Sequence, residues 1–163
     1  MESSEIITEL KNKIITELIN DDDIITGLGL NDDESPDDLT WNRIYPHDYI
    51  PQTETDVRSY IAVEVDIPER RMRYGETASD IWIHPYVMFR VLVHQEDMQL
   101  NLAGESCTRM DYLSKLIERK FNKRGDFGVG TLRRLSNTAG SVNTTYRYRL
   151  IVFETVEAVD VCG

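Results

Sequence analysis

Side chains that commonly perform chemistry are few in this chain of 163 residues, which holds three histidines and two cysteines. His84 and His94 lie ten residues apart on one expected strand, and His47 stands alone. No carboxylate occupies a ligand spacing beside them, which favours ordinary polar side chains over a metal site. Cys107 and Cys162 form no CxxC pair, so neither a disulfide framework nor a zinc site is predicted. Cys107 precedes an expected helix, which could lower the pKa of its thiol, but no partner base is suggested nearby.

Three further patterns resemble functional motifs, and each has a simpler interpretation. The acidic stretch at residues 20–31 does not place oxygen ligands and glycine in the register of a calcium loop, so a helix cap followed by a solvated loop is favoured. The GDFGVG run at residues 125–130 does not lead from a strand into a helix and lacks GK[ST], which disfavours phosphate binding. The YRYR run at residues 146–149 could stack single-stranded nucleic acid, but a half-exposed sheet edge is the simpler interpretation. We therefore expect no catalytic, metal or cofactor-binding residues, and no enzyme.

Charge is distributed unevenly along the chain, whose net charge is −11. Residues 1–56 carry fifteen acids and three bases, whereas residues 109–149 carry ten bases and three acids. An acidic chain is repelled by phosphate, so specific DNA binding is not expected. The two segments could instead meet across a subunit interface, or they could be solvated faces. The interface interpretation points to these side chains: Arg119, Lys120, Lys123, Arg124, Arg133, Arg134, Asp21, Asp22 and Asp23.

Hydrophobic periodicity predicts two principal helices. The first carries an apolar stripe at three- and four-residue spacing, with Ser3 or Ser4 as its cap: Ile6, Ile7, Leu10, Ile14, Leu18 and Ile19. Residues 20–23 either end this helix or cap a second short turn, which Gly27 and Gly29 then stop. The other principal helix, at about residues 108–123, starts at Thr108, buries Met110, Leu113, Leu116, Ile117 and Phe121, and is closed by Gly125.

Alternating apolar residues predict strands at residues 41–45, 59–67, 81–94 and 146–161, with Pro85 either bending the third or marking it as an edge strand. Segments 31–38, 69–80 and 126–145 are expected to be flexible loops, the last as a hairpin or a long arm. The fold class is therefore α+β: one domain over residues 1–163, with a mixed, mostly antiparallel sheet packed against an N-terminal helix and a second helix. No apolar run approaches the roughly 20 residues of a membrane span, and the acidic start lacks a basic signal region, so no membrane association is expected.

The order of these elements resembles a known family. A helix precedes RIYPHDYIPQ (residues 43–52), SYIAVEVDI (59–67) and VMFRVLVH (87–94), and a helix and a terminal strand follow. This order is similar to that of the tail terminator or tail-completion proteins of long-tailed bacteriophages, from whose shorter members segments 31–38, 69–80 and 126–145 depart.

The resemblance implies a structural virion protein that forms a homohexameric ring, caps the tail tube and joins the tail to the head connector. Its partners would be further copies of itself, the tail tube protein and a head-completion or connector protein, with DNA passing through the lumen without specific binding. It would reside in the neck or tail of the virion, and in the host cytoplasm during assembly. Two alternatives stay open: another head–tail connector or neck subunit, and a small cytosolic α+β enzyme or ligand-binding domain.

Overall fold

A computed structural model describes residues 2–31, 33–68, 82–156 and 159–160 of the chain. The expected loop at residues 69–80 lies outside the described residues. The helices are α1 (Ser3–Ile19), α2 (Asp22–Leu28) and α3 (Arg109–Phe121), with short 3₁₀ turns η1 (Pro36–Asp38) and η3 (Gln95–Asp97). The strands are β1 (Ile44–Tyr45), β2 (Ser59–Asp66), β3 (Trp82–Ile83), β4 (Tyr86–His94), β5 (Leu132–Ser141), β6 (Tyr146–Thr155) and β7 (Val159–Asp160).

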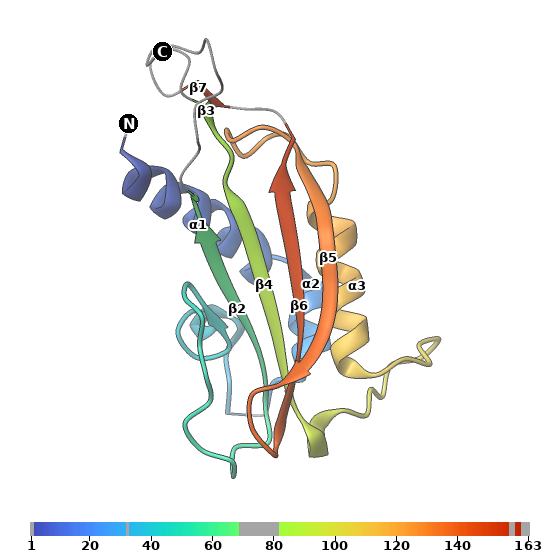
Figure 1. The fold of residues 1–163 in the computed structure, drawn as a ribbon. Helices are drawn as coiled ribbons and strands as arrows, with labels where there is room; N and C mark the ends of the chain where they lie inside the picture. The colour runs from blue at the N-terminus through green and yellow to red at the C-terminus, as the bar shows by residue number, and fades with distance from the viewer. Residues whose placement is uncertain (1, 32, 69–81, 157–158, 161–163) are drawn as a thin grey trace.

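A five-stranded sheet in the order β1-β2-β4-β6-β5 forms the centre of the fold (Figure 1). Strand β1 runs parallel to β2, and the other neighbours are antiparallel. Strands β3 and β7 form a separate antiparallel pair. The expected α+β class with a mixed, mostly antiparallel sheet is confirmed.

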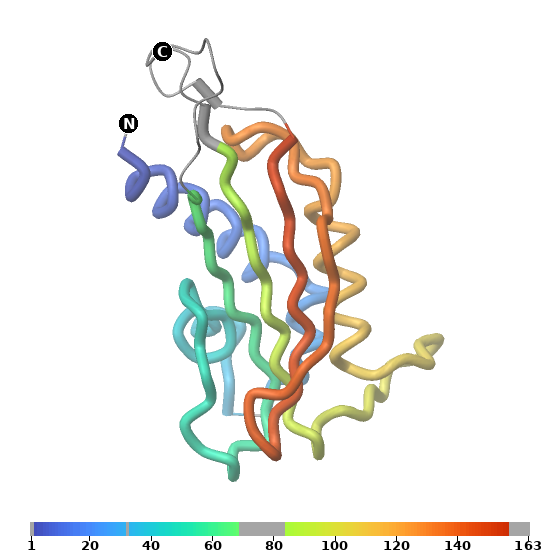
Figure 2. Tube along the Cα trace, viewed as in Figure 1, coloured from blue at the N-terminus to red at the C-terminus, as the bar shows by residue number. Residues whose placement is uncertain are grey.

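The three helices lie on one face of this sheet, which gives the fold two layers (Figure 2). Alternate strand residues point toward the helices, and Val63, Phe89, Val91, Ile151 and Phe153 are fully buried there. The apolar stripes of α1 and α3 complete this core. The period of two along the strands and of 3.6 along the helices thus directs both apolar sets into one layer.

Local sequence chemistry explains most helix boundaries. Thr108 caps α3 by accepting a hydrogen bond from the Asp111 N–H, as its position predicts. Asp21 caps α2 in the same way, and Gly29 ends it with a left-handed φ of 64°. Helix α1 starts one residue earlier than expected: Glu2 is its N-cap, and the Glu5 carboxylate accepts from the Glu2 N–H, so neither Ser3 nor Ser4 has the capping role.

The end of α3 also differs from expectation. The helix stops at Phe121, with Asn122 as its C-cap, before Gly125 is reached. Lys123 then adopts a left-handed φ of 68°. Its N–H donates to the carbonyl of Leu132, which ties the chain after α3 to the start of β5. A hydrogen bond to the sheet therefore holds a lysine in a conformation that glycine would otherwise favour.

Several expected strands are shorter than their patterns suggest. The strand expected from residue 41 begins at Ile44, because Trp41 lies in a turn with φ of 70° and is 60% exposed. The strand expected over 81–94 is divided into β3 and β4, and Pro85 lies at the break. The strand expected over 146–161 is likewise divided into β6, which ends at Thr155, and β7.

Segment 126–145, expected to be a flexible loop, contains the ten-residue strand β5, which forms a hairpin with β6. Of the two arrangements considered, the hairpin is the one the fold adopts. Its pattern is hard to recognise because β5 is an edge strand with mostly exposed residues, so one buried face does not dominate its sequence. A bulge at Leu135 between Arg134 and Ser136 also interrupts the alternation.

Candidate assembly surfaces

Arg43 is the most enclosed charged residue that the structure describes, with an exposure of 1%. Its Nε and Nη2 atoms each lie 2.7 Å from a different carboxylate oxygen of Glu34, which makes a bidentate ion pair. Nη1 donates to the carbonyls of Leu28 (3.2 Å) and Ser59 (2.9 Å). Burial alone would raise the pKa of Glu34, but hydrogen bonds and charge from Arg43 outweigh it and hold that pKa below 4.5. One guanidinium thus joins the end of α2, the segment before η1 and the start of β2.

A second arginine, Arg109, binds the same end of α2 from the other side. Its Nη1 donates to the carbonyl of Gly27 at 2.6 Å and its Nε to the carbonyl of Asp97 at 2.8 Å. Gly27 allows α2 and α3 to approach closely, because a Cβ there would lie 2.8 Å from Leu113 Cδ2. The C-terminal carbonyls of α2 are therefore held by cations on both sides, as the helix dipole favours.

The basic end of α3 contacts acids of α1 and α2 within the same chain. Lys120 Nζ lies 2.9 Å from Asp21 Oδ2 and 3.5 Å from Glu17 Oε2. Arg124 pairs with Glu17 at 3.1 Å and Asp126 at 2.6 Å. Hydrogen bonds from Arg124 lower the pKa of Glu17 below 4.5 and that of Asp126 from 3.8 to about 2. The charge asymmetry of the sequence is thus partly neutralised by intrachain packing of α3 against α1 and α2.

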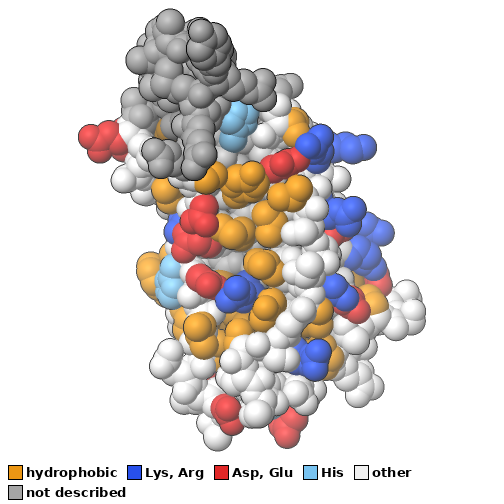
Figure 3. Space-filling view, viewed as in Figure 1, with side chains coloured by type: hydrophobic (Ala, Val, Ile, Leu, Met, Phe, Trp, Pro, Cys, Tyr) orange, Lys and Arg blue, Asp and Glu red, His pale blue; other side chains and the backbone are white. Residues whose placement is uncertain are grey.

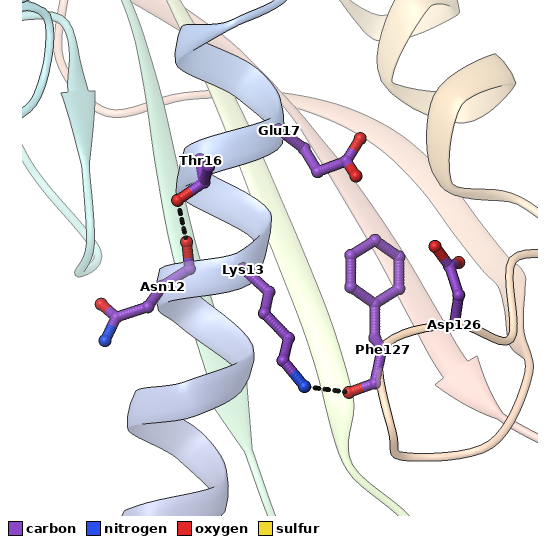
Figure 4. Close-up of a pocket in the computed structure, with 6 residues that line it drawn as sticks. All are labelled: Asn12, Lys13, Thr16, Glu17, Asp126 and Phe127. Carbon is purple, nitrogen blue, oxygen red and sulfur yellow. Dashed lines mark hydrogen bonds between the residues drawn. The ribbon is translucent and has the colours of Figure 1, made fainter.

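The glycine-rich run 125–130 closes over this cluster beside α1 (Figure 4). Phe127 is buried against Phe121, with ring centroids 5.8 Å apart, and the Arg124 guanidinium lies 4.8 Å from its ring. Lys13 reaches from α1 to the carbonyl of Phe127 at 3.3 Å, as the dashed line in Figure 4 marks. Glycine at 128 has φ of 81°, which a tight turn requires. The run is therefore a structural turn that anchors an aromatic side chain.

The remaining predicted interface residues lie nearer solvent. Arg133 and Arg134 are exposed on β5 and pair within the chain with Glu154 and Glu118. The other four are exposed and form no ion pair with another residue that the structure describes: Arg119, Lys123, Asp22 and Asp23. The structure therefore brings Lys120 and Asp21 together, leaves the other members of the predicted set apart, and does not test their role between subunits.

The sheet face opposite the helices is only partly covered (Figure 3). Its central apolar residues come from neighbouring strands and are half-buried: Met88 on β4, and Leu150 and Val152 on β6. In Figure 3 apolar side chains gather over the centre of this face, acidic ones lie mainly toward β2, and most of the visible basic ones lie over β5 and β6. We call this the open face.

A pocket lies on the open face in front of Met88 and Arg90. Its floor is apolar, formed by Ala62, Met88 and Leu150, and its rim carries the carboxylates of Asp48, Glu64 and Asp66. Arg90 pairs with Asp48 at 2.9 Å and stacks on Tyr148, its guanidinium carbon 4.7 Å from the ring centroid. Lys11 of α1 lies 2.5 Å from Glu64, so the site is an apolar depression whose edge carries two paired carboxylates and Asp66, which has no described cation partner.

An aromatic cluster borders the pocket at the β1 side. The rings of Tyr45 and Tyr49 stack with centroids 3.7 Å apart, and the ring centroids of Trp41 and His47 lie 5.5 Å apart in the same cluster. Burial, together with the neighbouring tyrosines, raises the pKa of Tyr45. Burial also raises the pKa of Tyr60, which lies beneath the stack. Tyr45 and Tyr60 therefore stay protonated at neutral pH and pack as neutral rings.

The three histidines and Cys107, which the sequence offered as candidate functional residues, make contacts typical of structural side chains. His94 is buried, with its Nδ1 accepting from the Glu96 N–H and its Nε2 2.9 Å from the carbonyl of Glu54. His84 lies 3.4 Å from the carbonyl of Thr155, and His47 belongs to the aromatic cluster. Cys107 lies 3.7 Å from a Glu105 oxygen, and Cys162 falls outside the described residues. Across the described ranges, no group of three or more His, Cys, Asp or Glu side chains is placed to hold a metal ion.

None of the helices within the described parts of the chain is long and apolar enough to cross a bilayer. The YomW family model matches residues 11–155, from within α1 to the last residue of β6. The chain belongs to the YomW family. Since YomW is a phage-derived family, this YomW chain is a phage-related protein, which agrees with the phage origin that the sequence resemblance implies. Comparison with curated proteins and with solved structures gives no match.

Proposed function

We propose that this YomW-family chain is a structural virion protein that forms a ring, caps the tail tube and joins the tail to the head connector. It acts by binding other proteins and performs no catalysis. Phage origin and the α+β order of elements support this role. The ring is a hexamer, as the similarity to tail terminators implies.

The observation that carries the proposal is the open face. A small domain rarely leaves central strands of its sheet half-exposed to solvent along an apolar strip unless another protein covers them. The strip runs over Met88, Leu150 and Val152, and ends at strand β5, whose outer side has no neighbouring strand among the described residues. Uncovered edge strands and apolar faces are typical of subunits that complete their burial in an assembly.

The two flanks of the sheet differ chemically, which suits a head-to-tail ring. The flank at β1 and β2 carries Asp48, Glu64 and Asp66, whereas the flank at β5 carries Arg133 and Arg134. A contact between unlike flanks repeats around an axis and closes into a ring if the rotation permits. Passing DNA would be repelled rather than bound by a chain of net charge −11.

The test is the behaviour of the purified full chain alone and with its tail tube protein. Light scattering combined with size exclusion, followed by negative-stain microscopy, should show rings, and added tube protein should form tubes that carry one ring at an end. A chain that binds the head connector but never tube ends would identify a head-completion or neck subunit instead. A chain that stays monomeric at every concentration and binds neither partner would contradict the proposal.

A further inference from the structure

We propose that the pocket on the open face receives the β5 bulge of a second copy, with Leu135 entering over Met88 and Arg133 meeting the acidic rim. This inference rests on the proposed ring and assigns the two surfaces that form its repeating contact.

The bulge presents an unusual pair of side chains. Leu135 is 53% exposed, and it lies at the irregularity where β5 has one residue more than β6 opposite it. A bulge turns a side chain away from the regular alternation of its strand, so Leu135 is aimed outward instead of into the core. Beside it, Arg133 is opposite Glu154 in the β5–β6 register and its side chain is 64% exposed, whereas Arg134 is opposite Phe153 and reaches Glu118 of α3 on the helix side of the sheet. Arg133 and Leu135 are therefore the cation and the leucine that this edge of the sheet offers to a partner.

The pocket has the complementary composition. Its apolar floor at Met88 matches a leucine side chain, and its acidic rim matches an arginine. Asp66 is exposed and forms no ion pair with another described residue, and the Asp48 side chain is 50% exposed despite its contact with Arg90. These carboxylates are available to a cation that approaches from outside, and complementary charge steers such an encounter and fixes its register.

The repeating contact joins two surfaces that lie at different places on the subunit. The pocket lies over β2 and β4, and the bulge lies on β5 at the far edge, with β6 between them. One subunit therefore offers its bulge to the next subunit's pocket while its own pocket receives the bulge of the subunit before. Such a contact generates a ring or an open chain of subunits, unless a two-fold axis lets two copies make both contacts with each other.

The experiment uses two full-length variants, each of which removes one surface. Leu135→Glu places a carboxylate against the acidic rim, and Asp66→Lys places a cation against Arg133 beside the bulge. Because both side chains are exposed, both variants should keep the wild-type thermal unfolding midpoint. Each alone should weaken self-association at least about tenfold, since like charges brought together oppose binding strongly. Ala103→Glu and Asp37→Lys, at exposed positions away from both surfaces, are the matched controls and should assemble as the wild type does.

Mixing the two variants gives the decisive result. The Leu135→Glu chain keeps an intact pocket and the Asp66→Lys chain an intact bulge, so an equimolar mixture forms one wild-type contact, and in the other contact the introduced carboxylate meets the introduced cation. Analytical ultracentrifugation should therefore show that the mixture regains assemblies of the 18.9 kDa chain that neither variant forms alone. Variants that assemble like the wild type, or a mixture that stays monomeric at the highest concentration, would overturn this inference while leaving a wild-type ring intact. A wild-type chain that never self-associates would overturn the proposed ring as well.

Discussion

Replacing Arg43 by methionine should destabilise the fold more than any other single loss of charge in the described chain. Methionine keeps much of the apolar stem, but Glu34 and the carbonyls of Leu28 and Ser59 lose their donor. Removing one partner of a buried ion pair costs about 3–5 kcal/mol, because the other charge stays buried without compensation. For a domain of this size the unfolding midpoint should fall by about 6–20 °C.

Arg133→Met is the matched control, since Arg133 also pairs with a carboxylate, that of Glu154, but is 64% exposed. Its cost should stay within about 1 kcal/mol. A double variant, Arg43→Met with Glu34→Met, should recover part of the stability lost in the single variant, because no charge is then buried alone. Urea unfolding followed by circular dichroism measures all three. If Arg43→Met costs no more than Arg133→Met, the guanidinium does not hold α2 to the sheet and the reasoning is refuted.

Two further predictions concern the helix layer. Ile117→Ala should lower the free energy of unfolding in urea by about 2–5 kcal/mol, and Leu116→Ala clearly less, because Ile117 is fully buried and Leu116 only partly. The reverse order would mean that Leu116, and not Ile117, lies on the buried face of α3. Burial raises the pKa of Asp21, but hydrogen bonds and charge from Lys120 and the backbone outweigh it and hold that pKa below 3.8. The stability that ionised Asp21 contributes is present above the unfolded pKa and is lost as pH falls through the folded pKa. The melting temperature of the protein should therefore decrease once the pH is lowered below about 4. Lys120→Gln should reduce this acid-dependent loss, and an unchanged pH profile in that variant would count against the pairing.

Regular periodicity made most of the fold predictable. Helices α1 and α3 and strands β2 and β4 each bury one face. The spacing of apolar residues along the chain therefore identifies both the type of element and the face that is buried. Where residues are exposed on both sides, as in β5, sequence alone favours a loop. Leu116 shows the same limit within a helix: it fits the stripe of α3 but lies at its margin, where only the packed neighbours decide how much surface is buried.

Arg43 shows what a linear pattern cannot reveal. Its sequence neighbours, Asn42 and Ile44, do not indicate that its side chain is buried. Its partner Glu34 belongs to a segment whose composition predicts an acidic, mobile loop. The ion pair exists because α2, that segment and β2 converge on one point, which only the tertiary fold produces. The only signal in the sequence was negative: Arg43 is the first cation after a long stretch, residues 14–42, that contains none.

The separation of charge along the sequence serves mainly to pack the helices. Lys120 and Arg124 meet Glu17, Asp21 and Asp126 within one chain, so reversing the basic end of α3 would disturb folding before it disturbed assembly. An effect of those substitutions on assembly would therefore be difficult to separate from their effect on the stability of the subunit. The open face does not share this difficulty, because Leu135 and Asp66 are exposed in the isolated subunit. Electrostatic effects on ring formation should accordingly appear at the bulge and the pocket rim, and should weaken with salt while the folded subunit keeps its melting temperature.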